Sequence, residues 1–176
     1  LRRLGAEYVI TGDEEVIRSA DRVLLPGVGE ASTAMARLRG SGLAEVVPTL
    51  TRPVLGICIG MQLMCLRSEE GGAECLGIFD TVVSKMEAAG GLKVPHIGWD
   101  TITDLRSPLF DGLKQGEYVY YVHSYAPGIC THTIAVTDYG SPLSAALGNG
   151  NFYGTQFHPE KSGATGGRIL DNFLKL

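Results

Sequence analysis

Short apolar runs alternate with amphipathic segments in the first half of the chain. Residues 22–25 and 53–57 are expected to be buried strands, because nearly every position in them is apolar. Each is followed by a segment with helical spacing of its apolar residues, at 30–39 and 60–67. The same reasoning predicts a helical turn at 1–5, a strand at 6–10 and a short helix at 14–20.

The second half of the chain changes to short strand-like runs with turn signals between them. The predicted strands are 81–85, 101–103, 116–125, 131–138, 143–147 and 151–157, and a helix at 166–174 closes the chain. Strands alternating with helices, then a β-rich insertion and a final strand–helix pair, indicate an α/β domain. Without a repeat or a linker-like composition, residues 1–176 are expected to form a single domain.

Composition excludes several classes of protein. With 44% hydrophobic and 19% charged residues, the chain is not of the disordered kind. A net charge of −4 leaves no basic excess for nucleic acid. The longest mostly apolar run, 53–66, is shorter than the about 20 residues that a membrane helix needs. No Cys-x-x-Cys or His-x-x-x-His pair offers a metal site, and the cysteine usage indicates a reducing, cytoplasmic compartment.

Residues 56–60 read Gly-Ile-Cys-Ile-Gly and join a predicted strand to a predicted helix. This is the arrangement of a nucleophile elbow, with cysteine in the place of serine. Flanking glycines let such a strained turn close, and the amides of the following helix favour a thiolate at Cys58. The alternative is a buried structural cysteine, which is the reading we prefer for Cys65, Cys75 and Cys130 because no such glycines flank them.

A possible base lies near the end of the chain, in His158-Pro159-Glu160. Proline makes the preceding residue extended, and residues two apart in an extended segment share one face. Glu160 is therefore expected to hold one imidazole nitrogen of His158, leaving the other to take the thiol proton. Taken alone, a His-Pro-Glu tripeptide is more often an ordinary turn, but a glycine-flanked cysteine makes the combination more specific.

Two further features are less specific. Residues 26–29, Pro-Gly-Val-Gly, suit either a phosphate-binding turn or a strand whose amides form an oxyanion hole. Since no Gly-Lys-Ser/Thr follows, a nucleotide P-loop is disfavoured. His123, in an aromatic strand end, is expected to be a hydrogen-bonded wall residue.

Three motifs together resemble the triad-type, class I glutamine amidotransferases. They are Pro-Gly-Val-Gly at 26–29, Gly-Ile-Cys-Ile-Gly-Met-Gln at 56–62 and Gln-Phe-His-Pro-Glu at 156–160, in that family's order. The segments Lys-Val-Pro-His-Ile-Gly-Trp-Asp at 93–100 and Tyr-Val-His-Ser-Tyr at 121–125 resemble the glutaminase subunits of imidazole glycerol phosphate synthases. Lys161-Ser162 fits the same group.

The resemblance implies a three-layer, flavodoxin-like α/β fold with a mixed, mainly parallel sheet and helices on both faces. It also implies hydrolysis of L-glutamine through a cysteine thioester, without metal or organic cofactor. The ammonia would pass to a (β/α)₈-barrel cyclase subunit, in a heterodimer that makes imidazole glycerol phosphate in histidine biosynthesis.

Residue by residue, the resemblance assigns three kinds of role. The catalytic residues are Cys58, His158 and Glu160. The substrate-binding residues are Gly27, Val28, Gly29, Ile59, Gln62, Ser124 and Tyr125, and amides of Val28 or Gly29 and of Ile59 form the oxyanion hole. The partner-interface residues are Pro95, His96, Trp99, Tyr121 and Lys161.

The resemblance has two gaps and leaves three alternatives. The family begins with a strand and a Gly-Asn loop, so we expect an amino-terminal strand to be missing, and residues 68–77 resemble a variable loop without assigned roles. The alternatives are a glutaminase subunit of a pyridoxal phosphate or anthranilate type synthase, a non-catalytic binding module and a stand-alone cysteine amidohydrolase. The Pro-His-Ile-Gly-Trp segment argues against the first and the intact Cys58, His158 and Glu160 against the second, while high activity without a partner would favour the third.

Overall fold

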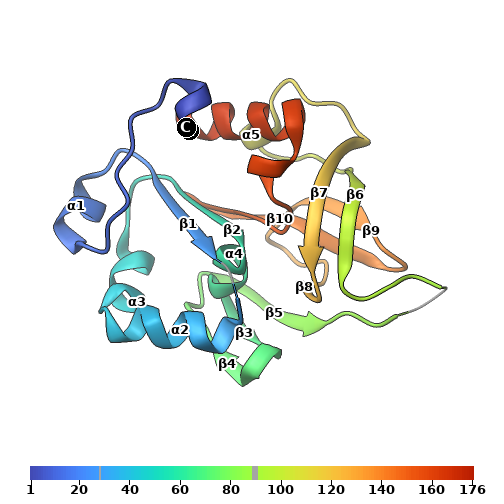
Figure 1. The fold of residues 1–176 in the computed structure, drawn as a ribbon, viewed down its shortest axis with the longest axis horizontal. Helices are drawn as coiled ribbons and strands as arrows, with labels where there is room; N and C mark the ends of the chain where they lie inside the picture. The colour runs from blue at the N-terminus through green and yellow to red at the C-terminus, as the bar shows by residue number, and fades with distance from the viewer. Residues whose placement is uncertain (28, 89–90) are drawn as a thin grey trace.

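The fold is built on a mixed five-stranded sheet in the order β1-β2-β11-β10-β9 (Figure 1). We describe it from a computed structural model, which covers residues 1–27, 29–88 and 91–176. The strands are β1 (Val23–Gly27), β2 (Val54–Cys58), β9 (Thr133–Asp138), β10 (Pro142–Asn149) and β11 (Phe152–Thr155). β2 pairs in parallel with both β1 and β11, whereas β10 pairs antiparallel with its two neighbours. Parallel pairing in this sheet is therefore confined to the strands around Cys58.

The central sheet is covered on both faces. Successive side chains of β2 point to opposite sides of the sheet, so they join different clusters. Leu55 and Ile57 join a core cluster with Ile169 and Phe173 of α5 (Gly163–Lys175). On the other face, Val54 packs in a second cluster with residues of α4 (Ile59–Leu63). In Figure 1, α5 lies on one side of the sheet, and α2 (Ala31–Gly40) and α3 (Leu43–Val46) lie on the other. The prediction of helices on both faces is confirmed.

Two smaller sheets flank this centre. One has the order β4-β3-β5-β8, and the other is the antiparallel pair β6–β7. Their strands are β3 (Cys65–Ser68), β4 (Ala73–Glu74), β5 (Phe79–Lys85), β6 (His96–Ile102), β7 (Glu117–His123) and β8 (Tyr125–Pro127). Short 3-10 turns complete the chain, namely η1 (Arg2–Leu4), η2 (Val47–Thr49), η3 (Glu70–Gly72), η4 (Pro108–Phe110) and η5 (Pro159–Lys161).

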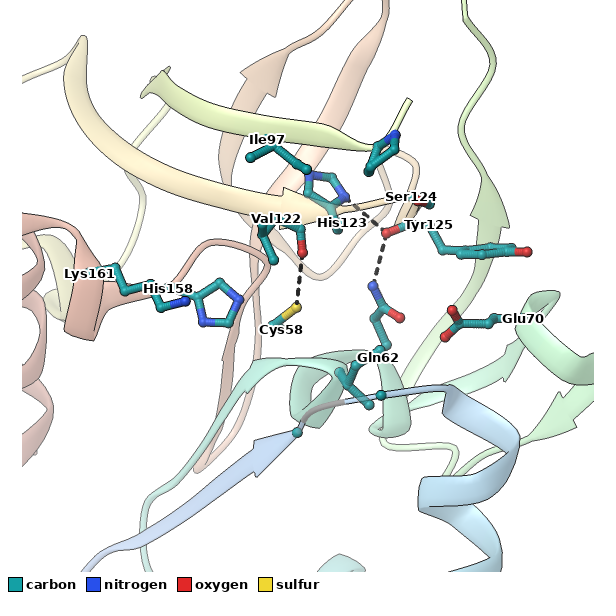
Figure 2. Close-up of a pocket in the computed structure, with 14 residues that line it drawn as sticks. Cys58, Gln62, Glu70, Ile97, Val122, His123, Ser124, Tyr125, His158 and Lys161 are labelled. Atoms are coloured by element: carbon teal, nitrogen blue, oxygen red, sulfur yellow. Dashed lines mark hydrogen bonds between the residues drawn. The ribbon is translucent and has the colours of Figure 1, made fainter. Parts of the chain in front are cut away.

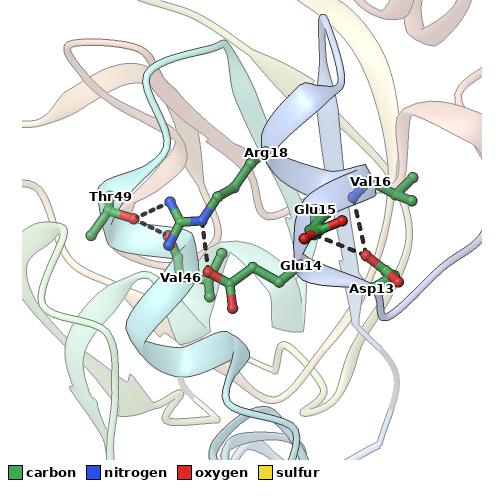
Figure 3. Close-up of polar contacts among 7 residues, drawn as sticks. All are labelled: Asp13, Glu14, Glu15, Val16, Arg18, Val46 and Thr49. Atoms are coloured by element: carbon green, nitrogen blue, oxygen red, sulfur yellow. Dashed lines mark hydrogen bonds and ion pairs between the residues drawn. The ribbon is translucent and has the colours of Figure 1, made fainter.

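Helix α1 (Glu14–Ser19) is held by polar contacts at both ends (Figure 3). The Asp13 carboxylate accepts the amide N–H groups of residues 15 and 16, as an N-cap does, which confirms the predicted helix start. At the other end, Arg18 donates to Glu14 at 2.7 Å and to the Thr49 hydroxyl at 2.9 Å, so α1 is tied to the turn after α3.

The strand predicted at 116–125 is divided at Ser124 into β7 and β8, which belong to different sheets. Two other predicted elements differ more from the structure. Residues 6–10 are not a strand: Tyr8, Val9 and Ile10 are exposed, and no described strand lies alongside to share a hydrogen-bond ladder. The helix predicted at 60–67 ends at Leu63. Carbonyls of residues 63–65 accept amides of residues 76–79, and this pairing draws the chain into strand β3.

Candidate active site

A cavity of about 380 Å³ opens where the carboxyl ends of β1 and β2 meet β7 and the turn η5 (Figure 2). This is where open α/β sheets bind their ligands. Its lining includes these expected site residues: Gly27, Gly29, Cys58, Ile59, Gln62, Pro95, Ser124, Tyr125, His158 and Lys161. Segments far apart in the sequence thus converge on one pocket. Val28 lies outside the described residues.

Cys58 sits in the sharp turn between β2 and α4, with φ 54° and ψ −112°. A residue with a Cβ rarely adopts a positive φ, so the turn must be enforced by its surroundings. Packing enforces it: a Cβ on Gly60 would lie 1.8 Å from the Leu25 carbonyl oxygen, and one on Gly27 would lie 2.5 Å from the Gly60 nitrogen. The backbones of β1 and α4 therefore touch directly, and the Cys58 side chain projects into the cavity.

His158 is fastened to β7 through its own backbone. Its N–H donates to the Tyr120 carbonyl at 2.9 Å, while its carbonyl accepts the Ser162 hydroxyl at 2.6 Å. That hydroxyl in turn accepts the Tyr120 N–H at 2.9 Å. Helix α5 approaches closely behind, because a Cβ on Gly166 would lie 1.9 Å from the Pro159 carbonyl oxygen. The imidazole is thereby held on a rigid turn.

The surroundings of the His158 ring increase its affinity for a proton. Its Nδ1 lies 2.7 Å from Glu160 Oε1, and its buried Nε2 has no hydrogen-bond partner in the part of the chain that the structure describes. The Cys58 sulfur beside the ring and the Glu160 carboxylate together raise the pKa of His158 to about 9. Partial burial opposes ionisation of Glu160, but the hydrogen bond from His158, a backbone hydrogen bond and the nearby positive charges of His158 and Lys161 together outweigh burial and lower the pKa of that carboxyl. The arrangement favours an imidazolium next to the sulfur.

Gln62 presents one unused acceptor to the cavity. Its Nε2 donates to the Tyr125 carbonyl at 2.9 Å and to Gln156 Oε1 at 3.1 Å. Its Oε1 is buried without a partner among the described residues. A buried carbonyl oxygen left unpaired costs free energy, so this atom is suited to accept a donor from a bound molecule.

Glu70 is a cavity residue that the sequence did not reveal, since residues 68–77 resemble a variable loop. Its side chain lines the cavity and accepts the Ala31 N–H at 2.9 Å, at the start of α2. Figure 2 shows the carboxylate on the same side of the pocket as the Gln62 amide. An acid within a turn carries no distinctive spacing, so only the fold brings it to the site.

Two expected interface residues do not face outwards. Strand alternation turns His96 and Tyr121 into the protein, where they are 3% and 1% exposed and their rings stack. The prediction that these two side chains contact a partner at the surface is therefore wrong. Tyr120, the preceding residue on β7, faces outwards instead. His123 is a hydrogen-bonded wall residue as predicted: its Nδ1 lies 3.0 Å from the Tyr125 carbonyl oxygen, and burial lowers its pKa to about 4.

The outer face of the β6–β7 pair carries large apolar side chains. Ile97, Trp99 and Tyr118 are 60%, 55% and 60% exposed. The register pairs Ile97 with Val122 and Trp99 with Tyr120, and Lys161 Nζ lies 5.9 Å from the centre of the Tyr120 ring. Since Ile97, Val122 and Lys161 also line the cavity, this apolar face is continuous with the cavity mouth.

Within residues 1–27, 29–88 and 91–176, no group of three or more histidine, cysteine, aspartate or glutamate side chains is arranged to hold a metal ion. None of the described helices is long and apolar enough to cross a membrane.

Comparison with known proteins agrees with this geometry. A family model described as glutamine amidotransferase class-I matches residues 2–176. The whole chain is 56% identical to the imidazole glycerol phosphate synthase subunit HisH of Bacteroides fragilis (strain YCH46) and 48% identical to that of Yersinia pseudotuberculosis serotype I (strain IP32953), spanning 90% of each.

Solved structures agree in fold at low sequence identity. A crystal structure of a glutamine amidotransferase has a TM-score of 0.73 at 19% identity, covering 99% of this chain and 88% of that one. A putative GMP synthase protein from Thermoplasma acidophilum has a TM-score of 0.70 at 21% identity, covering 93% and 75%. These two likenesses show the fold, and the family match shows that this chain belongs to the class I glutamine amidotransferases.

Proposed function

We propose that this chain is the glutaminase subunit of an imidazole glycerol phosphate synthase, which hydrolyses L-glutamine and delivers ammonia to a cyclase subunit in histidine biosynthesis. The observation that carries the proposal is the convergence of Cys58 and the His158–Glu160 pair on one cavity. The relatives named HisH support the assignment of pathway and subunit. Residues 1–176 would act as a single domain in the cytoplasm, in keeping with the cysteine usage of the chain.

The reaction follows from the protonated state of His158 beside the Cys58 sulfur. Cys58, as thiolate, attacks the carboxamide carbon of glutamine and forms a C–S bond, while the carbonyl oxygen becomes an oxyanion. The amide of Ile59 and that of Val28 or Gly29 would stabilise that charge. His158 imidazolium then gives its proton to the leaving nitrogen, so the C–N bond breaks and ammonia and a glutamyl thioester form.

Water completes the reaction. Neutral His158 takes a proton from the attacking water, the new oxyanion collapses, and the C–S bond breaks to release glutamate and the thiolate. Glu160 keeps the imidazole in one orientation throughout and stabilises its charged form. The net reaction is glutamine plus water to glutamate plus ammonia.

Substrate recognition would rest on the acceptors of the cavity. The α-ammonium group of glutamine supplies three N–H donors and a positive charge. Glu70 offers a carboxylate, and the unpaired Gln62 Oε1 offers a buried carbonyl oxygen on the same side of the pocket. Backbone groups of Ser124 and Tyr125 border the same space. These acceptors suit the amino end of the substrate, and Cys58 lies where its carboxamide end must react.

The cyclase subunit would cover the apolar face of β6–β7. Its exposed Ile97, Trp99 and Tyr118 form a patch of the kind that marks protein interfaces, and aromatic anchors dominate such interfaces. Because the patch reaches the cavity mouth, a partner docked there would cover that mouth and receive the ammonia directly. A (β/α)₈ barrel carries its active site at the C-terminal ends of its strands, where the ammonia would be used.

Replacing Cys58 by alanine tests the division of labour. We expect glutamine-dependent synthesis by the reconstituted complex to fall by about 10⁴-fold or more, while synthesis from added ammonium salt persists. Cys75→Ala is the matched control, because that thiol lies outside the cavity and should keep both activities. Loss of the ammonia-dependent reaction in Cys58→Ala would contradict the proposal. Full glutaminase activity of the unaltered chain without any partner would favour a stand-alone hydrolase.

Glu70→Gln tests the binding of the substrate amino group. The substitution keeps an oxygen to cap α2 but removes the charge, so KM for glutamine should rise by about 10- to 100-fold with a smaller change in kcat. Steady-state glutaminase kinetics of the complex measure both constants. Glu74→Gln, at an exposed carboxylate on β4, should leave KM unchanged. An unaltered KM in Glu70→Gln would show that the ammonium group binds elsewhere.

Trp99→Ala tests the docking face. Removal of a half-exposed aromatic anchor should weaken affinity for the cyclase subunit by about 2 kcal/mol, or about 30-fold in Kd, as calorimetric titration would measure. The control is Val16→Ala, an exposed apolar residue on α1, which Figure 1 places far from β6. Equal losses in both variants, or none in Trp99→Ala, would rule out this face as the interface.

A further inference from the structure

Gln156 is a buried polar residue that the mechanism above does not use. It is 1% exposed and lies between the end of β11 and His158. Its backbone N–H donates to the Ala145 carbonyl at 2.8 Å, which fixes the residue against β10. A buried carboxamide is stable only if its oxygen and its N–H groups find partners. The identity of those partners defines what Gln156 can do.

The orientation of the Gln156 carboxamide follows from a chain of hydrogen bonds that starts at a backbone carbonyl. The Tyr125 carbonyl can only accept, so the group of Gln62 that faces it at 2.9 Å must be Nε2. The same Nε2 lies 3.1 Å from Gln156, where it needs an acceptor, and this is Oε1. The Nε2 donor of Gln156 is then left to face the Cys58 sulfur, 3.8 Å away.

Besides the His158 ring, the sulfur has two polar neighbours among the described residues, and these two favour different protonation states of Cys58. The Val122 carbonyl oxygen lies 3.8 Å from Cys58 Sγ and can only accept, so it suits the thiol and repels a thiolate (Figure 2). Gln156 Nε2 donates, so its interaction with sulfur strengthens when the sulfur is charged. Without this donor, the His158 imidazolium alone would have to offset the negative charge of the thiolate.

We propose that Gln156 is a further catalytic residue, whose Nε2–H group donates to the Cys58 sulfur and stabilises the thiolate that attacks the substrate. The inference rests on the proposed glutaminase function for its role in turnover, but not for its effect on the sulfur. The Gln62 amide holds the Gln156 carboxamide in this orientation. Gln62 therefore both borders the substrate site and directs Gln156 Nε2 towards the Cys58 sulfur. Gln156 also favours departure of the thiolate when the thioester is hydrolysed.

The test uses two substitutions in the full-length protein. Gln156→Leu removes the donor, and Gln156→Glu keeps the shape and an acceptor for Gln62 but presents a carboxylate oxygen to the sulfur. The readout is the rate at which iodoacetamide alkylates Cys58 as a function of pH, followed by mass spectrometry. For Gln156→Leu we expect about tenfold slower alkylation at neutral pH and a midpoint of the pH–rate profile at higher pH. The glutamate variant should react more slowly still.

A control separates this effect from a general loss of stability. Asn172 is another buried carboxamide, which donates to the Leu109 and Asp111 carbonyls at 3.1 and 2.9 Å. It lies outside the cavity lining, so Asn172→Leu should lower the melting temperature without changing the pH–rate profile of Cys58. In the Gln156 variants, kcat for glutamine hydrolysis should fall by more than KM rises.

A pH–rate profile that is unchanged in either Gln156 variant would overturn the proposal and reduce Gln156 to a packing residue. Should the leucine variant fail to fold, the glutamate variant carries the test alone. If the profile shifts in the variants but the unaltered protein in complex with a cyclase subunit hydrolyses no glutamine, this inference stands and the proposed function is refuted instead.

Discussion

The turn at Cys58 is the constraint on which the rest of the site depends. Its positive φ costs about 1–3 kcal/mol for a residue with a side chain, and the chain meets that cost through packing around it. β2 is hydrogen-bonded on both sides, by β1 and β11, and α4 presses its Gly60 against the Leu25 carbonyl. With the backbone fixed in this way, the sulfur faces the cavity.

Two imidazoles near the sulfur show how the same side chain is given opposite properties. His158 sits between the sulfur and the Glu160 carboxylate, which favour its charged form. His123 is also buried, and its contact with the Tyr125 backbone carbonyl does not offset the cost of burying a charge, so its pKa falls to about 4. At neutral pH one ring carries a proton for the leaving group, and the other is a neutral wall. Environment rather than residue type therefore assigns the roles.

Local sequence predicts most of this arrangement, because the catalytic residues lie in short segments with distinctive sequences. The glycine-flanked cysteine and the His-Pro-Glu turn each specify their own geometry, and the structure brings their side chains to one cavity. Glu70 could not be predicted this way, because its approach to the site depends on how β3 and α2 pack. Tyr121 lies on the opposite face of its strand from the one expected, since a run of aromatic residues hides the alternation that the pairing with β6 fixes.

The strand predicted at 6–10 failed for a related reason. A β-prone segment is a strand only beside another strand, and local sequence does not say which neighbour is available. The same holds for the segment after Leu63. Its sequence pattern predicts a continued helix, but pairing with β5 makes it strand β3.

The charge on His158 underlies the chemistry of the site, and Cys58 and Glu160 together maintain it. NMR titration of the histidine side-chain signals measures that charge. We expect a His158 pKa of about 9 in the intact protein, with His123 at about 4 as an internal reference. The pKa of His158 should move down towards its ordinary 6.5 in Cys58→Ala and, separately, in Glu160→Gln. A His158 that titrates at or below 6.5 in the unaltered protein, or that does not respond to either substitution, would show that Cys58 and Glu160 do not hold the ring in its charged form.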